Sequence, residues 1–212
     1  MTMTVSLVSV IHNEEDRLPG MLDFHQPWVD EVVVVHDGPC ADASIRIARE
    51  RGCLTTVAPY TGYCEPHRKL GGSLAHGDWV LFVDADERFP IGFLQAARKI
   101  SSRADGFQAI AMPRRTHWDD GRPDVLDWQV RFIRRDTLVV SDIIHTTPTT
   151  SGTIVTVPGW EIQHENRVAD IPEKIERYRK IVRRQLDEAP PSDPVRTHLR
   201  RCLAELGEGS DE

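Results

Sequence analysis

The chain has 212 residues, of which 40% are hydrophobic, and its formal net charge is -7. This length suits one α/β domain with a short appendage, because single domains usually run to roughly 100–200 residues. The acidic balance argues against a nucleic-acid-binding protein, which normally carries a basic face. Since no apolar run approaches the ~20 residues that cross a bilayer, we also expect no membrane-spanning segment.

The cysteines and the N-terminal residues bear on localisation. Cys40, Cys53, Cys64 and Cys202 are widely spaced and form no C-x-x-C pair, so neither a disulfide framework nor a zinc site is predicted. The opening MTMTVSLVSV has no basic n-region and no cleavage site, which favours a first strand over a signal peptide. We therefore expect a cytoplasmic protein with free thiols.

The first half of the chain alternates predicted strands with predicted helices. The strands are short apolar or β-branched runs: Val5–Ile11, Glu31–Val35, Cys53–Val57 and Trp79–Val83. The predicted helices are Pro19–His25, Ala43–Arg51, Glu65–His76 and Ile91–Ser101. Asp42 can cap the second helix, and Gly52 stands where a helix often ends in left-handed backbone. This alternation predicts a parallel, doubly wound sheet.

The second half is predicted to be mixed. Gly106–Met112 and Gln129–Arg135 are interpreted as strands, the latter half-exposed because polar and apolar residues alternate in it. Between them, residues 113–128 are polar and aromatic without clear periodicity, which predicts either a functional or mobile loop or an ordinary surface loop. Two further short strands are predicted at Thr153–Val157 and Trp160–His164.

Two helices are predicted at the C-terminal end. Asp170 and Glu173 form a capping-box pattern, and apolar residues then repeat at helical spacing as far as Leu186. Pro190-Pro191 ends this helix, and Asp193-Pro194 begins a last one. We therefore divide the chain into a main α/β domain, 1–168, and a helical extension, 169–212.

The extension carries basic pairs. Arg183-Arg184 and Arg200-Arg201 could lean on an anionic membrane surface or on a lipid-linked molecule, which would place the protein peripherally at the inner face of the membrane. A solvated helix face is the alternative.

Polar residues follow three of the predicted strands. They are His12-Asn13-Glu14, Asp37-Gly38 and Asp84-Ala85-Asp86. In an open parallel sheet, ligands bind beyond the carboxyl ends of the strands. Asp84 and Asp86 can point to the same side, and two carboxylates at one strand end suit Mg²⁺ or Mn²⁺ bridged to nucleotide phosphates. Strand-end aspartates that only cap the following helix are the alternative.

Three segments carry a family resemblance. VSVIHNEE, VVVVHDGPCADAS and HGDWVLFVDADERF resemble the signatures of family 2 glycosyltransferases with the GT-A fold, in the same order. QVRFIRRDTLVVSDIIH is similar to a late segment of the subgroup that builds lipopolysaccharide core. The resemblance implies a Rossmann-like, mostly parallel mixed sheet flanked by helices and an Asp-x-Asp metal site. It also implies transfer of a sugar from a nucleotide-diphosphate sugar to an acceptor hydroxyl, with inversion.

The resemblance implies roles on the nucleotide side of the site. Asn13 and Glu14 would lie beside the nucleotide, after His12, which stands where the family often has tyrosine. Asp37 would hold the base, although His36 replaces one aspartate of the usual Asp-Asp-Gly. The base is therefore left open.

Further implied roles concern the metal and the diphosphate. Asp84 would touch the ribose or the metal shell, Ala85 would lie beside the donor, and Asp86 would bind Mn²⁺ or Mg²⁺ directly. Arg68 matches an arginine that could meet the pyrophosphate, unless it lies on a solvated helix face. His164 matches a histidine that sometimes supplies a third metal ligand, which would favour Mn²⁺; a hydrogen bond at the sheet edge is the alternative.

The acceptor side has competing candidates for a general base. His145 falls where the family places an acceptor-side residue, and a histidine titrates near neutral pH. Asp142 and Glu161 compete with it for this role. The acceptor is expected to be a saccharide, a lipid-linked molecule or a small molecule, while the oligomeric state is left open.

Other classes with similar patterns fit less well. A sugar-nucleotide nucleotidyltransferase needs a glycine-rich, arginine-bearing loop after the first strand, where this chain has His12-Asn13-Glu14-Glu15. A phosphatase of the haloacid dehalogenase type needs its Asp-x-Asp after the first strand, and a dinucleotide dehydrogenase needs G-x-G-x-x-G. A non-catalytic sugar-nucleotide-binding protein would retain the same fold, so only turnover distinguishes it.

Overall fold

Four parallel strands form the first part of the sheet, as predicted. The structure, a computed structural model, describes residues 3–103 and 106–207. These strands are β1 (Val5–Ile11), β2 (Glu31–Asp37), β3 (Leu54–Ala58) and β4 (Trp79–Phe82). The helices of this part are α1 (Leu18–His25), η1 (Gln26–Trp28), α2 (Ser44–Glu50), α3 (Glu65–Leu74) and α4 (Ile91–Ser102). Gly52, with φ 74°, has the left-handed conformation expected after α2.

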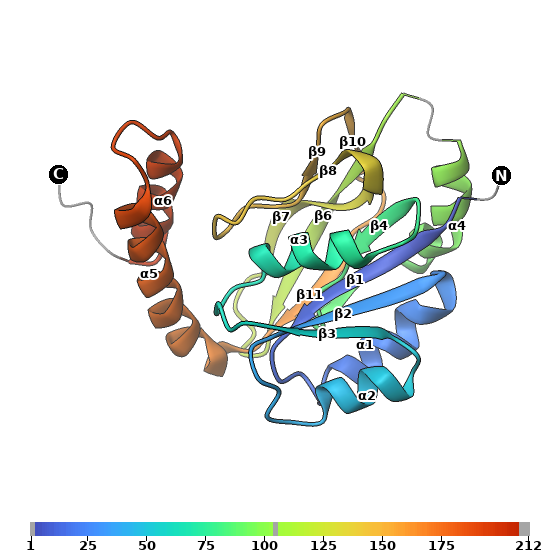
Figure 1. Ribbon diagram of the computed structural model, residues 1–212, viewed down its shortest axis with the longest axis horizontal. Helices are drawn as coiled ribbons and strands as arrows, with labels where there is room; N and C mark the ends of the chain where they lie inside the picture. Colours follow the sequence, from blue (N-terminus) through green and yellow to red (C-terminus); the bar gives the residue numbers. More distant parts are fainter. Residues whose placement is uncertain (1–2, 104–105, 208–212) are drawn as a thin grey trace.

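The complete sheet is mixed. Its strand order is β3-β2-β1-β4-β7-β6-β11-β5, and β10 also pairs with β6. The strands added by the second half are β5 (Glu87–Arg88), β6 (Ala109–Trp118), β7 (Val125–Arg134), β10 (Ile154–Thr156) and β11 (Ile162–Asn166). A separate pair joins β8 (Leu138–Val139) to β9 (Thr149–Thr150), after η2 (Arg135–Thr137). The predicted α/β fold with a mostly parallel mixed sheet is confirmed (Figure 1).

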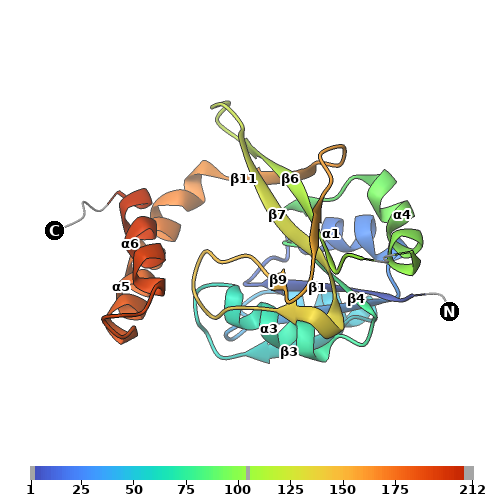
Figure 2. The same cartoon turned by 90° about the horizontal axis from the view of Figure 1, so that it is seen from above.

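The prediction of an aperiodic loop at residues 113–128 is wrong. β6 and β7 continue into this segment as a long antiparallel hairpin, which projects from the sheet in Figure 2. The cross-strand partners Arg114 and Asp127 are joined by hydrogen bonds of 3.1 and 2.8 Å. Opposite-charge pairs of this kind stabilise strands whose residues are too polar to show an apolar alternation.

β7 is also more buried than its alternating sequence predicts. Gln129, Phe132 and Ile133 are buried, and Arg131 is only 1% exposed. Arg131 lies on the side of the strand that was expected to face solvent. Its guanidinium is instead covered and paired with carboxylates, which is the condition under which an interior tolerates a charge.

Helices cover both faces of the sheet (Figures 1 and 2). On one face, α1, α2 and α4 pack on a core that includes Leu7, Leu22 and Phe93. On the other face, α3 lies against β1 and β2 over a core that includes Val8. A Cβ added at Gly71 of α3 would overlap the Val8 side chain, so glycine permits this close approach.

Two helices at the C-terminal end stand beside the sheet. They are α5 (Ile171–Glu188) and α6 (Val195–Glu205), which follow η3 (Val168–Asp170) and pack on each other through an apolar cluster of their own. The cluster includes Ile144, which connects the pair to the rest of the chain. The division into 1–168 and 169–212 stays a prediction, and its residues 1–2, 104–105 and 208–212 lie outside the described part.

Two predicted helix caps differ in the structure. Asp170 has helical backbone angles, φ -81° and ψ -14°, and makes no capping hydrogen bond at α5; its carboxylate lies 3.8 Å from Arg17. At α2 the capping position belongs to Ala43, while Asp42 accepts a hydrogen bond of 2.9 Å from the Ser44 N–H. Within the described ranges, no helix combines the length and the apolar character that membrane crossing requires.

Candidate functional site

The carboxyl ends of β1, β2 and β4 meet at one edge of the sheet, where a cavity of about 530 Å³ opens. One wall comes from these strand ends and the loop after β3. The other wall is the segment from Asn166 through the first two turns of α5. Of the predicted site residues, the cavity is lined by His12, Asn13, Glu14, Asp37 and Asp86.

The loop after β1 is held in an unusual conformation by histidines. Asn13 has φ 54°, in the left-handed region, and its N–H donates to His36 Nε2 at 3.1 Å. The His36 Nδ1 donates to the Gly38 carbonyl at 2.8 Å, which fixes the tautomer that accepts from Asn13. His12 donates to the Asp37 carbonyl at 2.6 Å and packs its ring against Tyr60, with centroids 5.2 Å apart.

The Asp37 carboxylate organises the loop after β3. It accepts hydrogen bonds from the Thr61 N–H at 2.6 Å, the Gly62 N–H at 2.8 Å and His67 Nε2 at 2.8 Å. Burial alone would raise the pKa of Asp37, but these donors hold it below its usual range. Asp37 is therefore an ionised group at the end of β2, in the wall of the cavity.

Asp84 lies behind the cavity and is held by two arginines. Arg68 of α3 reaches both of its carboxylate oxygens at 2.9 Å, and Arg131 of β7 reaches one at 2.8 Å. Although burial opposes ionisation, Arg131 and Arg68 keep the pKa of Asp84 far below its usual range. Neither Asp84 nor Arg68 lines the cavity, and the same is true of Ala85.

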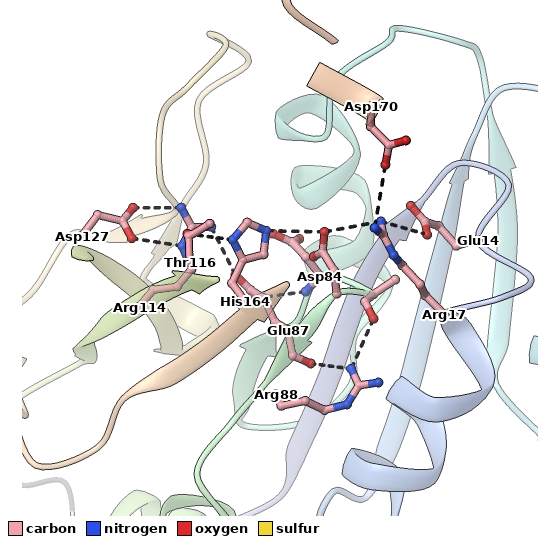
Figure 3. A network of polar contacts seen from close by, with 12 residues as sticks. Glu14, Arg17, Asp84, Glu87, Arg88, Arg114, Thr116, Asp127, His164 and Asp170 are labelled. Atoms are coloured by element: carbon pink, nitrogen blue, oxygen red, sulfur yellow. Dashed lines mark hydrogen bonds and ion pairs between the residues drawn. The ribbon is translucent and has the colours of Figure 1, made fainter. Parts of the chain in front are cut away.

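Glu87 extends this pairing into a buried network, parts of which appear in Figure 3. Its side chain is fully covered, and Arg131 contacts it at 2.6 Å while Arg114 contacts it at 3.3 Å. The second oxygen of Glu87 accepts from the Asp84 N–H at 3.1 Å, and the Glu87 N–H donates to the Asp84 carbonyl at 3.0 Å. These reciprocal bonds close the turn that presents Asp86 to the cavity.

Asp86, which lines the cavity, is paired with His164 of β11. His164 Nε2 lies 3.4 Å from Asp86 Oδ2, and His164 Nδ1 lies 2.9 Å from the Thr116 hydroxyl. When the Thr116 hydroxyl accepts a hydrogen bond from Nδ1–H, Nε2 carries no proton and can bind a metal ion. An oxygen and a nitrogen atom at this separation can share one Mn²⁺ or Mg²⁺ ion, and the imidazole favours Mn²⁺.

A second charged cluster surrounds Arg17, which Figure 3 shows between Glu14 and Asp170. The Arg17 guanidinium is 3.7 Å from Glu14, 3.7 Å from Asp86 and 3.8 Å from Asp170. Burial raises the pKa of Glu14 to about 7, against the opposing effect of Arg17. This cluster joins the strand ends to the first turn of α5.

The candidates for the acceptor side lie outside the cavity lining. The His145 ring packs edge-on against Tyr178, a cavity residue, with centroids 4.9 Å apart, and burial lowers the pKa of His145. The Asp142 carboxylate faces Lys69 at 3.6 Å. Glu161 is engaged by Arg115 at 2.7 and 2.8 Å.

Sequence reasoning did not single out Arg17, Glu87, Arg131, His67 or Tyr178. Arg17 and Glu87 look like ordinary charged residues beside a helix and a strand. Their partners lie on other elements, so no local spacing marks them. Arg131 carried one signal, since it belongs to the segment that resembles a family motif, but the alternation of β7 suggested a solvent-facing side chain.

A match to a known family identifies the class of enzyme. The profile of the family described as glycosyl transferase family 2 matches residues 6–151. The chain therefore belongs to family 2 of the glycosyltransferases.

Curated relatives match a smaller part of the chain. An uncharacterised glycosyltransferase of Rickettsia conorii is 32% identical over 87 residues, which cover 41% of this chain and 30% of that protein. One from Rickettsia typhi is 34% identical over 83 residues, which cover 39% of this chain and 28% of that protein. The matched part is thus about a third of the length of these relatives.

Solved structures share the fold across nearly the whole chain. The S. aureus TarS 1-349 complex with UDP-GlcNAc is 17% identical with a TM-score of 0.56, covering 96% of this chain and 71% of that one. A mannosyltransferase from Pyrobaculum calidifontis, in complex with GDP-Man and Mn²⁺, is 14% identical with a TM-score of 0.56, covering 97% and 70%. These likenesses establish the GT-A fold of the chain.

Proposed function

We propose that this chain transfers a sugar from a nucleotide-diphosphate sugar to an acceptor hydroxyl, with a divalent cation at Asp86 and with inversion at the anomeric carbon. The observation that carries the proposal is the pair of Asp86 and His164, 3.4 Å apart, whose Asp86 lines a cavity at three strand ends. Family membership supports the reaction class. Two structures with the same fold contain sugar nucleotides, which supports the donor class.

The cavity suggests how the donor is oriented. Asp37, ionised and fixed by the loop after β3, offers a carboxylate to the donors of a nucleotide base. Tyr60 and His12 present rings on which a base or ribose can pack, and Asn13 and Glu14 lie beside them. We therefore propose that the base end lies near β1 and β2, and the diphosphate near Asp86.

Asp84 and Asp86 take different parts in the proposal. The cation, when bound, offsets the charge that develops on the departing nucleoside diphosphate. Asp86 and His164 would hold it, with Thr116 orienting the imidazole. Asp84 is neutralised by Arg68 and Arg131, so we assign it to holding the turn of the motif and its Asp86.

For the base that deprotonates the acceptor we propose His145 in preference to Asp142. The lowered pKa of His145 keeps it neutral near pH 7, and its ring packs against a residue of the cavity wall. The Asp142 carboxylate faces Lys69 instead. His145→Gln is expected to lower kcat by about 100-fold, whereas Asp142→Asn leaves kcat near the wild-type value. The reverse result would move the assignment to Asp142.

The first experiment finds the donor. Thermal shifts would be measured with UDP-, GDP-, dTDP- and CDP-sugars, with and without Mn²⁺, because a ligand that binds only the native state raises the melting temperature. We expect one donor to give a shift that depends on Mn²⁺. A flat response to every donor contradicts the proposal.

The second experiment tests the role of Asp86. With the donor identified, its metal-dependent hydrolysis or transfer to candidate saccharide and lipid-linked acceptors is followed for Asp86→Ala. We expect a loss of at least about 100-fold, and a similar loss for the wild type in chelator. Asp136→Ala removes an exposed carboxylate on η2 and serves as the matched control. Full turnover by Asp86→Ala in chelator would refute metal dependence, and binding without any turnover would favour a non-catalytic sugar-nucleotide-binding protein.

A further inference from the structure

Arg17 stands at the start of α1, and its side chain is 18% exposed at the cavity wall. Its guanidinium lies among three carboxylates. Nη1 is 3.7 Å from both Glu14 and Asp86, and Nη2 is 3.8 Å from Asp170. Glu14 and Asp86 belong to the strand ends, while Asp170 belongs to the opposite wall. Arg17 is thus a positive charge placed between the two walls and next to the proposed metal ligand.

These contacts are charge contacts and not hydrogen bonds. Each exceeds the 2.7–3.2 Å of an ordinary N–H···O bond. Over residues 3–103 and 106–207, no protein acceptor within hydrogen-bonding distance is found for this guanidinium. Arg68, by contrast, holds Asp84 with two bonds of 2.9 Å. Arg17 therefore keeps its donors available and can move without breaking a fixed geometry.

We infer that Arg17 is a positioning residue that balances Asp86 while the donor is absent and shifts to the diphosphate when a divalent cation takes its place beside Asp86. The inference rests on the proposed function. A guanidinium and a divalent cation repel each other when both lie about 4 Å from one carboxylate. The diphosphate supplies the anion that draws Arg17 away, since the planar fork of arginine matches phosphate oxygens. The shift also releases Asp170 and hence the link to α5.

This exchange predicts opposite effects on two binding steps. Arg17→Gln removes the competing charge, so Mn²⁺ without nucleotide should bind about tenfold more tightly. The same variant loses a phosphate contact, so UDP or GDP with saturating Mn²⁺ should bind about tenfold more weakly. A side chain with a merely structural role would weaken both steps together. Arg17→Lys keeps the charge and should bind Mn²⁺ alone as the wild type does.

The experiment is a pair of titrations on the full chain. Mn²⁺ binding is followed by electron paramagnetic resonance without nucleotide, and UDP and GDP binding is followed by calorimetry at saturating Mn²⁺. Arg46→Gln, which removes an exposed charge on α2, is the matched control and should leave both affinities unchanged. Tighter Mn²⁺ with weaker nucleotide in Arg17→Gln supports the inference.

Two other outcomes have distinct meanings. If wild-type protein binds the nucleotide with Mn²⁺, but Arg17→Gln binds Mn²⁺ no more tightly or loses both affinities together, the inference is overturned and the proposed function stands. If the wild type with Mn²⁺ binds none of UDP, GDP, dTDP and CDP, the proposed function fails, and the inference with it.

Discussion

The two aspartates that follow β4 belong to regions with opposite organisation. Behind the cavity, Asp84 sits in a buried network with Arg68, Arg131 and Glu87, whose contacts measure 2.6 to 2.9 Å. In front, Asp86 sits in an open cluster whose contacts measure 3.4 to 3.8 Å. The two side chains are similarly exposed, Asp84 at 26% and Asp86 at 21%, so the difference lies in how closely their partners hold them. One short motif thus supplies a tightly fixed carboxylate and, in the proposed function, the carboxylate that binds the cation.

Removal of Arg131 should have the largest effect on stability. Arg131→Met leaves Asp84 and Glu87 short of a buried cation, and we expect unfolding to cost about 3–5 kcal/mol less. The measurement is urea unfolding at pH 7, followed by circular dichroism. A loss below about 1 kcal/mol would mean that the network behind the cavity is no more rigid than the cluster in front of it.

A matched pair of amides compares the two aspartates directly. Asp84→Asn leaves two arginines facing a neutral group and should destabilise the protein by about 2–3 kcal/mol. Asp86→Asn should change stability by less than about 1 kcal/mol, because its contacts are long and lie at a cavity. Urea unfolding of both variants at pH 7 measures the two losses. Equal losses would show that Asp84 and Asp86 contribute equally to stability.

Glu14 provides a test by pH. Its pKa is raised to about 7 in the folded state, from an ordinary 4.5, so the folded protein binds this proton more tightly than the unfolded chain. Stability from this group is full below pH 4.5 and is lost as pH rises through 7. Glu14→Gln should therefore be more stable than the wild type by about 2 kcal/mol at pH 8, and equal to it near pH 4. The free energy of unfolding of both proteins is measured from pH 4 to pH 8. A difference between them that does not change with pH would contradict the burial of this carboxyl group.

The smallest effect is expected away from both regions. Arg46 and Glu50 form a pair on α2 whose side chains are 66% and 60% exposed. Arg46→Gln should change the free energy of unfolding by less than about 0.5 kcal/mol. Urea unfolding of this variant gives the smallest loss against which the others are compared. A larger loss would show that exposed ion pairs also stabilise this protein.

Much of the fold follows from local patterns. The apolar runs of β1, β2 and β4, with helices between them, predict the parallel half of the sheet, and this was confirmed. The hairpin of β6 and β7 was missed because its stability comes from cross-strand pairs such as Arg114 with Asp127, which a single strand does not reveal. The capping box at Asp170 was wrong because this residue has helical backbone angles, whereas a capping side chain needs extended backbone to reach the first N–H groups of the helix.

The candidate site could be predicted only in part. Strand ends marked Asn13, Asp37 and Asp86, because a polar residue after a buried strand is a local signal. Roles for these residues stay predictions, as does the narrower resemblance to lipopolysaccharide core enzymes. Arg131 and Glu87 could not be found, since a buried ion pair looks like two unrelated surface charges until the fold brings them together.

The histidine next to the last residue of β2 has a consequence for redesign. His36 accepts from the Asn13 N–H and donates to the Gly38 carbonyl, a combination that an ionised aspartate, which only accepts, does not offer. Asn13 in turn accepts from the Ala41 N–H at 2.9 Å. The loops after β1 and β2 are thereby interlocked as one unit. Transplanting either loop alone from a relative would separate these partners, so a redesign of this wall of the cavity has to move both loops together.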